Sequence, residues 1–499
     1  MSTILQKARE YEQKYRVYIT PEERPGYHLT PQVGWMNDPN GFSFYGGEYH
    51  LFYQYHPYST AWGPMHWGHA VSTDLLRWKY LPAAIAPDTE IDQVGCFSGS
   101  AIELPDGRQL LMYTGVRQGY NEDGTRRDQQ TQCLAVGNGL NYVKYADNPV
   151  LDDKDLPEGF TTADFRDPKL WREEDGSYAC VVGARTEDGS GAILLFTSPD
   201  GFRWKYETML DRSYNEYGRM WECPDFFPLD GKQLLITSPQ DMSPLGLEFH
   251  NGNNTMALIG SYDRSTHHFE REQVQAIDYG LEFYAPQTML TPDGRRVMIG
   301  WLQNWDTCSA QPPNPKWFGQ TSTPRELSLK DGRLIQMPVR EIEALHGRRV
   351  AYQDVTVQEE VSLKGVYGRM VDMTVTLRPA DIDGFQQFTI KVAKGSQHYT
   401  NITFFPKASV LRVNRAHSGL ARDIIHERDC LVRQQNGEIK LRILLDRFSL
   451  EIFVNDGEQA MSTAIYTPQT ADGISFEADR SVIMSVEKFD IVAESSRRE

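Results

Sequence analysis

PDGRQLLMYTG (105–115) is one of five similar stretches that decide the fold of this chain. Each stretch has a turn that ends in glycine, followed by a hydrophobic run about as long as one β-strand. The other four are YGGEYHLFYQY (45–55), EDGSYACVVGA (174–184), LDGKQLLITSP (229–239) and PDGRRVMIGW (292–301). Their marked glycines follow one another at intervals of 60, 69, 55 and 63 residues. A four-stranded propeller blade needs roughly 40–60 residues, so the repeat predicts a five-bladed β-propeller.

A second element repeats in the same rhythm. VSTDLLRWKY (71–80) and FTSPDGFRWKY (196–206) share a turn with serine, aspartate and tryptophan at similar spacing, and weaker versions occur at 137–145 and 260–270. The alternative is a set of unrelated hairpins. Five copies in similar order favour the propeller over that alternative.

The repeat stops after about residue 345. VDMTVTL (371–377), FTIKVAK (388–394) and SVIMSVEKFDIV (481–492) alternate with period two, which is typical of an antiparallel β-sandwich. The sequence therefore predicts an all-β protein, with a five-bladed β-propeller domain at 1–345 followed by a C-terminal β-sandwich domain at 346–499. A helical period in the first fifteen residues predicts a short N-terminal helical segment.

Composition and charge exclude several classes of partner. The chain has 499 residues and a formal net charge of −17, which disfavours nucleic acids and anionic membranes. No run of 18 apolar residues offers a membrane span, and the charged N-terminus does not resemble a secretory signal. The six cysteines form no CxxC pair, which argues against a zinc site and against a disulfide scaffold. Reduced thiols in a cytoplasmic protein are therefore expected.

The repeat also supplies a register for candidate site residues. The positions nine residues before the five marked glycines are Asp38, Ser98, Asp167, Glu222 and Ala285. Equivalent positions on the first strand of each blade are expected to converge on the propeller axis. Since 68 of 499 residues are acidic, five random positions would hold about 0.7 carboxylates, whereas these hold three. Such clustering is costly without a chemical reason, because like charges disfavour one another's ionisation.

Local sequence assigns different tasks to these carboxylates. In WMNDPNG (35–41), a polar turn and Asn37 favour an ionised Asp38, which suits a nucleophile. In MWECPDFF (220–227), Trp221 and a Cys-Pro step flank Glu222, and partial desolvation there favours the protonated carboxyl of a general acid. Two carboxylates with different protonation states across one bond are the arrangement used in glycoside hydrolysis.

Aromatic and polar residues near these motifs suit a sugar. Candidate flat faces for stacking are Trp35, Trp62, Trp67, Trp221 and Trp301. Candidate hydrogen-bonding groups are Asn37, Gln54, Ser98 and Arg166. Taken singly, each of these has an ordinary structural explanation, so the interpretation depends on the whole set.

A metal site is the alternative use of three carboxylates, which could bind Ca²⁺ or Mn²⁺. No Asp-x-Asp ladder or helical histidine pair accompanies them. His56, His66 and His69 are close in sequence, but His66 and His69 lie on an expected strand. We therefore expect no metal.

At these residues the sequence resembles glycoside hydrolase family 32, the family of invertases, sucrose-6-phosphate hydrolases, inulinases and levanases. The likeness spans about residues 25–345 and extends more weakly into the tail. The matching blocks, in family order, include WMNDPNG, HLFYQYHP (50–57), MHWGHAVSTDLLRW (65–78), FSGSA (97–101), FRDPK (165–169), WECPDFF (221–227) and DYGLEFYAPQT (278–288).

The resemblance implies a five-bladed propeller and roles for single residues. Asp38 matches the nucleophile, Glu222 the general acid/base and Asp167 the transition-state stabiliser that binds fructose hydroxyls. The residues matching the wall of the fructose pocket are Asn37, Gln54, Trp62, Phe97, Ser98, Arg166, Tyr279 and Trp301. Members of the family need no metal or organic cofactor, so no cofactor is expected.

The implied function is that of a retaining β-fructofuranosidase acting on sucrose, sucrose 6-phosphate or short fructo-oligosaccharides. Asp225 in the WECPD block resembles the sucrose-directed pattern, whereas many inulinases and levanases have glycine there. A phosphorylated substrate calls for a cation at the rim, and Arg126, Arg127 and Lys316 are candidates that the sequence does not place. The alternatives are a fructosyltransferase, a fructan exo-hydrolase and a non-catalytic sugar-binding propeller. A small sugar is the expected partner, and the chain is expected to be a monomer or homodimer.

The block LLDRFSLEIFVNDGE (444–458) resembles the C-terminal β-sandwich of the same family. Its charged residues Asp446, Arg447 and Glu451 could be mistaken for catalytic groups. We interpret them as solvent-facing strand residues near a turn.

Overall fold

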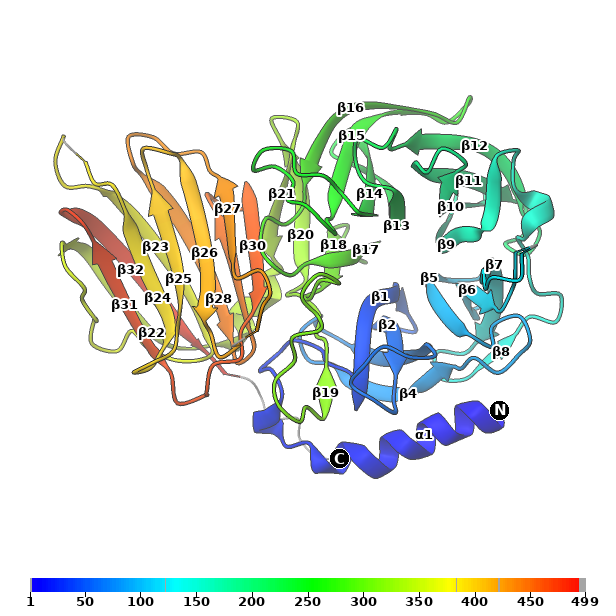
Figure 1. Cartoon of the computed structure of the whole chain (residues 1–499), viewed down its shortest axis with the longest axis horizontal. Helices are drawn as coiled ribbons and strands as arrows, with labels where there is room; N and C mark the ends of the chain where they lie inside the picture. The colour runs from blue at the N-terminus through cyan, green and yellow to red at the C-terminus, as the bar shows by residue number, and fades with distance from the viewer. Residues whose placement is uncertain (1, 122, 383, 421, 493–499) are drawn as a thin grey trace.

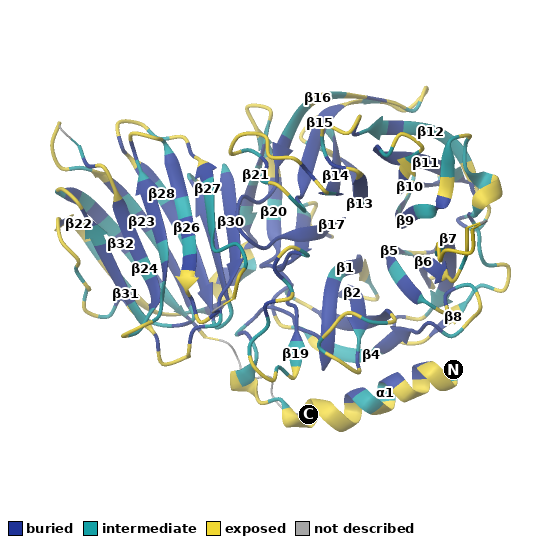
Figure 2. Cartoon of the chain, viewed as in Figure 1, coloured by how far each residue is buried: buried dark blue, intermediate teal, exposed yellow. Residues whose placement is uncertain are grey.

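The computed structural model describes residues 2–121, 123–382, 384–420 and 422–492 of the chain. A ring of five sheets lies beside a two-sheet sandwich, and a single long helix runs along the outside of the ring (Figure 1). The all-β prediction of a five-bladed propeller followed by a sandwich is confirmed. Buried strands dominate the centres of both parts, and exposed residues concentrate in the connecting loops (Figure 2).

Each blade is an antiparallel sheet built from consecutive strands. Blade one contains β1 (Gly34–Tyr45), β2 (Glu48–His56), β3 (His66–Ser72) and β4 (Lys79–Ile85). Blade two contains β5 (Gly95–Glu103), β6 (Gln109–Arg117), β7 (Gln129–Gly137) and β8 (Tyr142–Lys144). Blade three contains β9 (Phe160–Arg172), β10 (Tyr178–Thr186), β11 (Gly191–Ser198) and β12 (Lys205–Arg212). Blade four contains β13 (Met220–Leu229), β14 (Lys232–Gln240), β15 (Met256–Asp263) and β16 (His268–Ala276). Blade five contains β17 (Tyr284–Leu290), β18 (Arg296–Trp301), β20 (Arg325–Lys330) and β21 (Arg333–Pro338).

The glycines that mark the repeat explain why the blades form where they do. All five lie in the turn between the first and second strand of a blade, with φ between 81° and 89°. Glycine adopts this left-handed conformation without steric cost, so each marks a hairpin. The short strand β19 (Trp317–Phe318), from the blade-five segment, pairs in parallel with Gly34 and Trp35 and closes the ring.

The sandwich contains a six-stranded and a five-stranded sheet. The first has the order β22 (His346–Val357), β32 (Val482–Ile491), β23 (Val371–Pro379), β28 (Ile439–Asp446), β29 (Ser449–Val454) and β30 (Gln459–Ala464). The second has the order β27 (Glu427–Leu431), β26 (Val410–His417), β25 (Tyr399–Phe405), β24 (Phe388–Lys394) and β31 (Gly473–Ala478). β21 ends at Pro338 and β22 begins at His346, while a division into domains at 345/346 stays a prediction.

The expected N-terminal helix is α1 (Thr3–Tyr15), which Ser2 caps by accepting a hydrogen bond from the Leu5 amide. Its buried residues are Leu5, Ala8 and, unexpectedly, Glu12, whose carboxylate accepts a hydrogen bond from the Ala83 amide of β4. The shorter 3₁₀ helices are η1 (Arg16–Tyr18), η2 (Pro21–Glu23), η3 (Asp153–Asp155) and η4 (Arg340–Leu345). Among the described helices, none has the length and apolar character needed to cross a membrane. The six cysteines are free thiols, and the cytoplasmic location stays a prediction.

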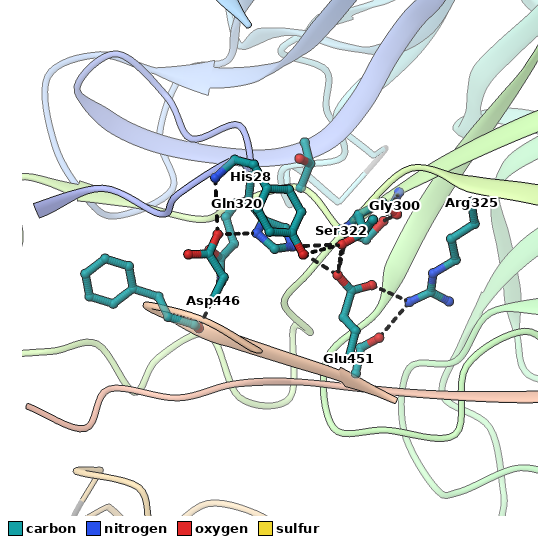
Figure 3. A network of polar contacts seen from close by, with 12 residues as sticks. His28, Gly300, Gln320, Ser322, Arg325, Asp446 and Glu451 are labelled. Atoms are coloured by element: carbon teal, nitrogen blue, oxygen red, sulfur yellow. Dashed lines mark hydrogen bonds and ion pairs between the residues drawn. The ribbon is translucent and has the colours of Figure 1, made fainter. Parts of the chain in front are cut away.

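A buried polar network joins the propeller to the sandwich (Figure 3). His28 contacts Asp446 at 2.7 Å through Nδ1 and Glu451 at 3.0 Å through Nε2. Arg325 of β20 donates to the second Glu451 oxygen at 2.8 Å and to Asp278 at 3.0 Å. All five side chains are at most 1% exposed. The interpretation of Asp446 and Glu451 as solvent-facing is therefore wrong.

Arg447 was also expected to face solvent, and it instead binds the N-terminal segment. Its guanidinium donates to the carbonyl oxygens of Pro21 and Arg24 at 2.9 and 2.8 Å. Asp446, Arg447 and Glu451 therefore hold residues 21–28 against the sandwich. Without these contacts, charges at the buried junction would be left uncompensated, which is costly.

The junction network predicts a pH-dependent stability. Burial alone would lower the pKa of His28, but the bonds and charges of Asp446 and Glu451 outweigh burial and raise it from 6.5 to about 9. A group whose pKa is higher in the folded state contributes its full stabilisation below its unfolded-state pKa. This stabilisation is lost as the pH rises toward the folded-state pKa. The melting temperature should therefore fall between about pH 6.5 and 9, and His28→Asn should remove this part of the fall.

Thermal unfolding across this pH range measures the effect. The matched control is His268→Asn, because His268 is exposed on β16. The control should keep the wild-type pH dependence. Equal slopes for wild type and His28→Asn would contradict the assignment.

Candidate active site

All five innermost strands carry a bulge at the same height, and Figure 1 shows these strands facing the middle of the ring. The register shifts occur in β1, β5, β9, β13 and β17. The bulged residues are Asp38, Ser98, Asp167, Cys223 and Ala285, each followed by proline or glycine. A bulge bends a strand and re-aims its side chains, so this ring of bulges determines what faces the axis.

Three of the bulged residues have backbone conformations that are uncommon for residues with a side chain. The φ angles of Asp167, Cys223 and Ala285 are 67°, 48° and 50°. Such angles persist where the surrounding structure imposes them, and they concentrate at functional sites.

In blades one, two, three and five, counting nine residues back from the marked glycine reaches the bulged residue. In blade four, the count is off by one residue. There the bulged residue is Cys223, and Glu222 precedes it. The β13–β14 turn has two residues between the paired Leu229 and Lys232, whereas blades two, three and five have longer turns. The β1–β2 turn also has two residues, but a second register shift between Asn40 and Ser43 lengthens β1 and keeps the count at nine.

Two rows of side chains follow from this register. The first row precedes the bulges and consists of Asn37, Phe97, Arg166, Glu222 and Tyr284. The second row is the bulged set, which consists of Asp38, Ser98, Asp167, Cys223 and Ala285.

In the first row, Glu222 accepts hydrogen bonds on both carboxylate oxygens. Oε1 accepts from Arg166 at 2.9 Å, and Oε2 accepts from Tyr284 Oη at 2.7 Å and Gln240 Nε2 at 2.9 Å. The expectation that Trp221 desolvates this carboxyl is wrong. The Trp221 ring is fully buried in the hydrophobic cluster that the propeller shares with the sandwich, and it donates to the Tyr217 carbonyl. Cys223 and Tyr284 belong to a separate cluster.

In the second row, one thiol lies between two aspartates. Cys223 Sγ is 3.5 Å from Asp38 Oδ2 and 3.6 Å from Asp167 Oδ2, and the Cys223 amide donates to the same Asp167 oxygen at 3.0 Å. The Ser98 hydroxyl donates to Asp38 Oδ2 at 2.7 Å, and Asn37 donates to Asp38 Oδ1 at 3.0 Å. The structure therefore brings the three predicted carboxylates together through direct and shared neighbours.

Crowding of like charge changes the ionisation of two members. Burial, and then the charge of Glu222, raises the pKa of Asp38 to about 6, although Asn37 and Ser98 oppose the rise. Burial and Glu222 likewise raise the pKa of Asp167 to about 7, with Arg166 opposing. Because these carboxyls interact, their protons belong to the group as a whole. Near neutral pH the group can therefore hold a proton beside an ionised carboxylate.

Comparison with known proteins identifies the family. Residues 28–338 match the glycosyl hydrolases family 32 N-terminal domain, and residues 341–493 match the family 32 C-terminal domain. The chain belongs to glycosyl hydrolase family 32. It is therefore a hydrolase, and the resemblance found from its motifs is confirmed.

Relatives and solved structures agree with this membership. The chain is 37% identical to a raffinose invertase of Escherichia coli over 91% of this chain and 92% of the relative. It is 34% identical to an Escherichia coli sucrose-6-phosphate hydrolase over 92% of both. A Bombyx mori GH32 β-fructofuranosidase superposes with a TM-score of 0.83 at 34% identity, covering 98% of both chains. A variant of that silkworm enzyme was solved in complex with sucrose.

The predicted pocket wall of this family 32 chain is only partly at the axis. Gln54 is buried and donates to the Cys96 carbonyl at 3.0 Å. Trp62 is 46% exposed, and its ring lies edge-on to Phe97 at 5.9 Å between centroids. Asn37, Ser98 and Arg166 contact the carboxylates directly, whereas Gln54 and Trp62 contact the neighbouring strand β5.

Two predicted wall residues lie elsewhere. Tyr279 donates to Glu248 at 2.9 Å in the cluster shared with the sandwich, and none of its contacts reaches the three carboxylates. Trp301 is fully buried and packs on Trp35 and Trp305, so it supports the floor without offering a face to a ligand.

Most of the tryptophans proposed for stacking are also buried. Trp35, Trp67 and Trp221 are at most 2% exposed, which leaves Trp62 as the accessible member of the five. Aromatic residues in a β protein fill cores more often than they face ligands, and sequence alone does not separate the two uses.

Three contacting residues were missed. Tyr284 stands one position before the blade-five bulge, so the same register applied to the first row would have found it. Cys223 was passed over because of the one-residue slip in blade four. Gln240 ends β14, and no repeat or motif marks it.

The metal alternative receives no support from the geometry. Across residues 2–492, excluding the undescribed positions 122, 383 and 421, no group of three or more histidine, cysteine, aspartate or glutamate residues is arranged to hold a metal ion. The absence of a metal stays a prediction.

A third row, two residues beyond the bulges, ties the blades together beneath the carboxylates. Its members are Asn40, Ser100, Lys169, Asp225 and Gln287. Asn40 accepts from the Gly99 amide, Gln287 donates to the Gly99 carbonyl and Ser100 donates to the Pro168 carbonyl, at 3.0, 2.6 and 2.7 Å. Each of these bonds crosses from one blade to another.

The ionic part of the third row joins blades three, four and five. Lys169 is 3.1 Å from Asp225 and donates to the Thr288 carbonyl at 2.6 Å, while the Thr288 amide donates to Asp225 at 2.7 Å. Asp225 is 1% exposed. Asp225 in the WECPD block therefore supports the packing of blades three, four and five, and its link to sucrose-directed specificity stays a prediction.

The Lys169–Asp225 pair gives a stability prediction. Removing one partner of a buried ion pair costs about 3–5 kcal/mol, because the other charge is left uncompensated. Lys169→Met should therefore lower the free energy of unfolding by about that amount and should also lower kcat, since Lys169 is two residues from Asp167 on β9.

Denaturant unfolding and steady-state kinetics test this prediction. The control is Lys232→Met, whose partner Glu272 is 43% exposed and whose loss should cost under about 1 kcal/mol. The double variant Lys169→Met/Asp225→Asn should lose less than the sum of the two single changes. Strict additivity would argue against direct coupling.

Proposed function

We propose that the chain is a retaining β-fructofuranosidase. It removes the terminal non-reducing β-D-fructofuranosyl unit from sucrose, sucrose 6-phosphate or short fructo-oligosaccharides by double displacement. The observation that carries the proposal is that Asp38 and Glu222, from blades one and four, meet beside Asp167 with different hydrogen-bonding partners. Retaining glycosidases have their two carboxyls about 5–5.5 Å apart, and the same separation is expected here.

The contacts fit a division of labour between the carboxyls. The Ser98 and Asn37 donors aim and stabilise the ionised Asp38, which attacks the anomeric carbon of fructose. Glu222 protonates the leaving oxygen and then, as a carboxylate, activates water to release fructose with net retention. Arg166 and Tyr284 hold the Glu222 carboxylate formed after the first step.

Asp167 is assigned to the fructose hydroxyls. The Cys223 amide fixes one of its oxygens, and the Thr114 hydroxyl accepts from the Asp167 amide at 2.9 Å. A fixed carboxylate that bonds sugar hydroxyls more strongly in the oxocarbenium-like state accelerates the reaction.

The relatives differ in leaving group and share the fructosyl unit. Their names include raffinose invertase, sucrose-6-phosphate hydrolase and a Bacillus subtilis levanase that is 34% identical over 92% of this chain. The three cations considered for a phosphate already have partners. Lys316 binds Glu23, Arg126 binds Asp128, and Arg127 donates to Thr161. Lys316 and Arg126 are thus paired with surface acids, whereas Arg127 bonds a neutral hydroxyl and keeps its charge.

Comparing kcat/KM for sucrose, sucrose 6-phosphate, short fructo-oligosaccharides and levan separates the substrates. Product analysis at high sucrose separates hydrolysis from fructosyl transfer, which uses the same three carboxylates. It remains a prediction that the protein is a monomer or homodimer and that it is cytoplasmic.

Replacing the two principal carboxyls should affect different steps. Asp38→Ala should abolish measurable sucrose turnover, because no nucleophile remains. Glu222→Ala should lose about 10²–10⁴-fold on sucrose and much less on an activated aryl fructoside, since a good leaving group needs no protonation.

External azide distinguishes these roles further. It should rescue Glu222→Ala on the activated fructoside and yield β-fructosyl azide, the product of net retention. Near-wild-type turnover by Asp38→Ala, or failure of azide rescue, would contradict the assignments.

The pH dependence of kcat/KM should have an acid limb near pH 6. The nucleophile must be ionised, and the pKa of Asp38 is raised to about 6 by burial and by Glu222, so activity should fall as pH drops through that value. Ser98→Ala removes a hydrogen bond to the ionised form, so it should move the limb to higher pH by several tenths of a unit.

A pH–rate profile on sucrose makes this measurement. The matched hydroxyl deletion Ser72→Ala, on β3, removes a bond to Asp74 and should leave the limb in place. A limb that stays fixed in Ser98→Ala would show that Asp38 does not set it.

A further inference from the structure

A cavity of about 260 Å³ lies between the propeller and the sandwich, outside the carboxylate cluster. One wall is the connection between β14 and β15, including Leu247, Glu248 and His250. The opposite wall is the edge strand β27, with Arg428, and Tyr279 also lines the cavity. Figure 1 shows β27 on the side of the sandwich toward the ring.

Four charged side chains line the cavity, namely Glu248, Glu427, Arg428 and Asp429. Among the described residues, neither Glu248 nor Arg428 forms an ion pair within 4 Å, and the Arg428 Nε is buried without a hydrogen-bond partner. The adjacent acids Glu427 and Asp429 are both paired with Arg412. A buried N–H without an acceptor is costly, so this geometry favours a ligand that supplies an acceptor to the Arg428 Nε.

The neighbouring groups present acceptors as well as donors. Glu248 Oε1 accepts from the Tyr279 hydroxyl at 2.9 Å and from the Ala276 amide at 2.8 Å. His250 Nδ1 is 3.2 Å from Arg428 Nη2, and burial together with Arg428 lowers the pKa of His250 to about 4, so its ring is neutral near pH 7. Because Arg412 pairs with Glu427 and Asp429, the groups left for a ligand are one carboxylate, one guanidinium and one neutral ring. These groups suit a ligand with closely spaced hydroxyls and no net charge.

Leu247 adds an apolar surface at the same cavity, and its side chain is 38% exposed. Small-molecule pockets commonly measure about 300–1,000 Å³, so this cavity is suited to something smaller than a typical drug-sized ligand. An amphipathic ring with hydroxyls on its edge has the required size and chemistry.

We propose that this cavity is a second saccharide site, which binds one neutral sugar ring through Arg428 and Glu248. The choice of sugar over other small polar ligands rests on the proposed function, because that reaction consumes and releases neutral sugars in the same molecule. The site itself is independent of the catalytic carboxylates.

The loop that forms the propeller wall is also anchored near the catalytic residues. It begins after Gln240, which donates to Glu222 at 2.9 Å. Toward its end, Asn253 donates through its amide and side chain to Asp306, at 2.9 and 2.8 Å. Asp306 follows Trp305, whose ring stacks on Trp35 at 6.0 Å. A sugar in the cavity would therefore stabilise a loop that is attached to the catalytic site at both ends.

Equilibrium dialysis with radiolabelled sucrose tests the proposal on the full-length protein. The Asp38→Ala background prevents turnover during the measurement. We expect two sucrose molecules per chain in Asp38→Ala and one in Asp38→Ala/Arg428→Met, with the second dissociation constant raised roughly tenfold or more by loss of a charged hydrogen bond. The matched control, Asp38→Ala/Arg378→Met, changes an exposed arginine of the sandwich and should keep both sites.

A second variant fills the cavity without removing a charge. Leu247→Trp should also abolish the second site, and thermal unfolding checks that each variant is folded. One site in Asp38→Ala, or two sites that survive both Arg428→Met and Leu247→Trp, would overturn the proposal. Competition at the second site by glycine or sucrose 6-phosphate, but not by glucose or fructose, would overturn its assignment to neutral sugars.

The failure of this proposal is distinguishable from failure of the proposed function. Sucrose hydrolysis by the wild type tests the function directly, and Arg428→Met alone should keep kcat within about twofold, because Arg428 contacts none of the three carboxylates. Hydrolysis without an Arg428-dependent site would overturn only the cavity assignment. An Arg428-dependent site without hydrolysis would overturn only the function.

Discussion

Three carboxyl groups and one guanidinium share the centre of the ring, and this imbalance of charge governs the rest of the site. Asp38, Asp167 and Glu222 converge there, while Arg166 is the cation in direct contact. Desolvation and mutual repulsion raise the pKa values of both aspartates, which leaves the group able to hold a proton near neutral pH. A reaction that needs a nucleophile and an acid in the same place uses this condition directly.

The bulges make such crowding geometrically possible. A regular strand would send successive side chains to opposite faces, whereas a bulge with a proline or glycine re-aims two neighbouring residues toward the axis. The first and second rows can then contact each other, as Asn37 contacts Asp38. Beneath them, the third row connects the blades through Lys169, Asp225 and backbone groups. The strain at the bulges is therefore supported by a buried polar layer.

The sequence predicted the parts of this arrangement that depend on local chemistry. Glycine turns marked every blade, and residues counted back from them located Asp38 and Asp167 correctly on their bulges. Counting back from the glycine missed the bulge in blade four by one residue, because the count depends on the length of the turn and on any second bulge in the strand. Neither feature has a clear signature in a single repeat. Burial of Trp301 and the displacement of Tyr279 depend on packing against distant segments. The partners of His28 are 418 and 423 residues away, a separation that no local pattern encodes.

The ring centre and the domain junction show why residue type alone does not identify a catalytic acid. At the junction, Asp446 and Glu451 share the protonated His28, and Arg325 adds a second cation on Glu451. Burial would raise the pKa values of both acids, but hydrogen bonds and these cations outweigh it, so Asp446 is lowered and Glu451 falls to about 2. Such acids remain ionised and serve as structural links. At the ring centre, carboxyls outnumber cations and the shift has the opposite sign. The balance between burial and compensating cations therefore distinguishes Asp38 and Asp167 from Asp446 and Glu451.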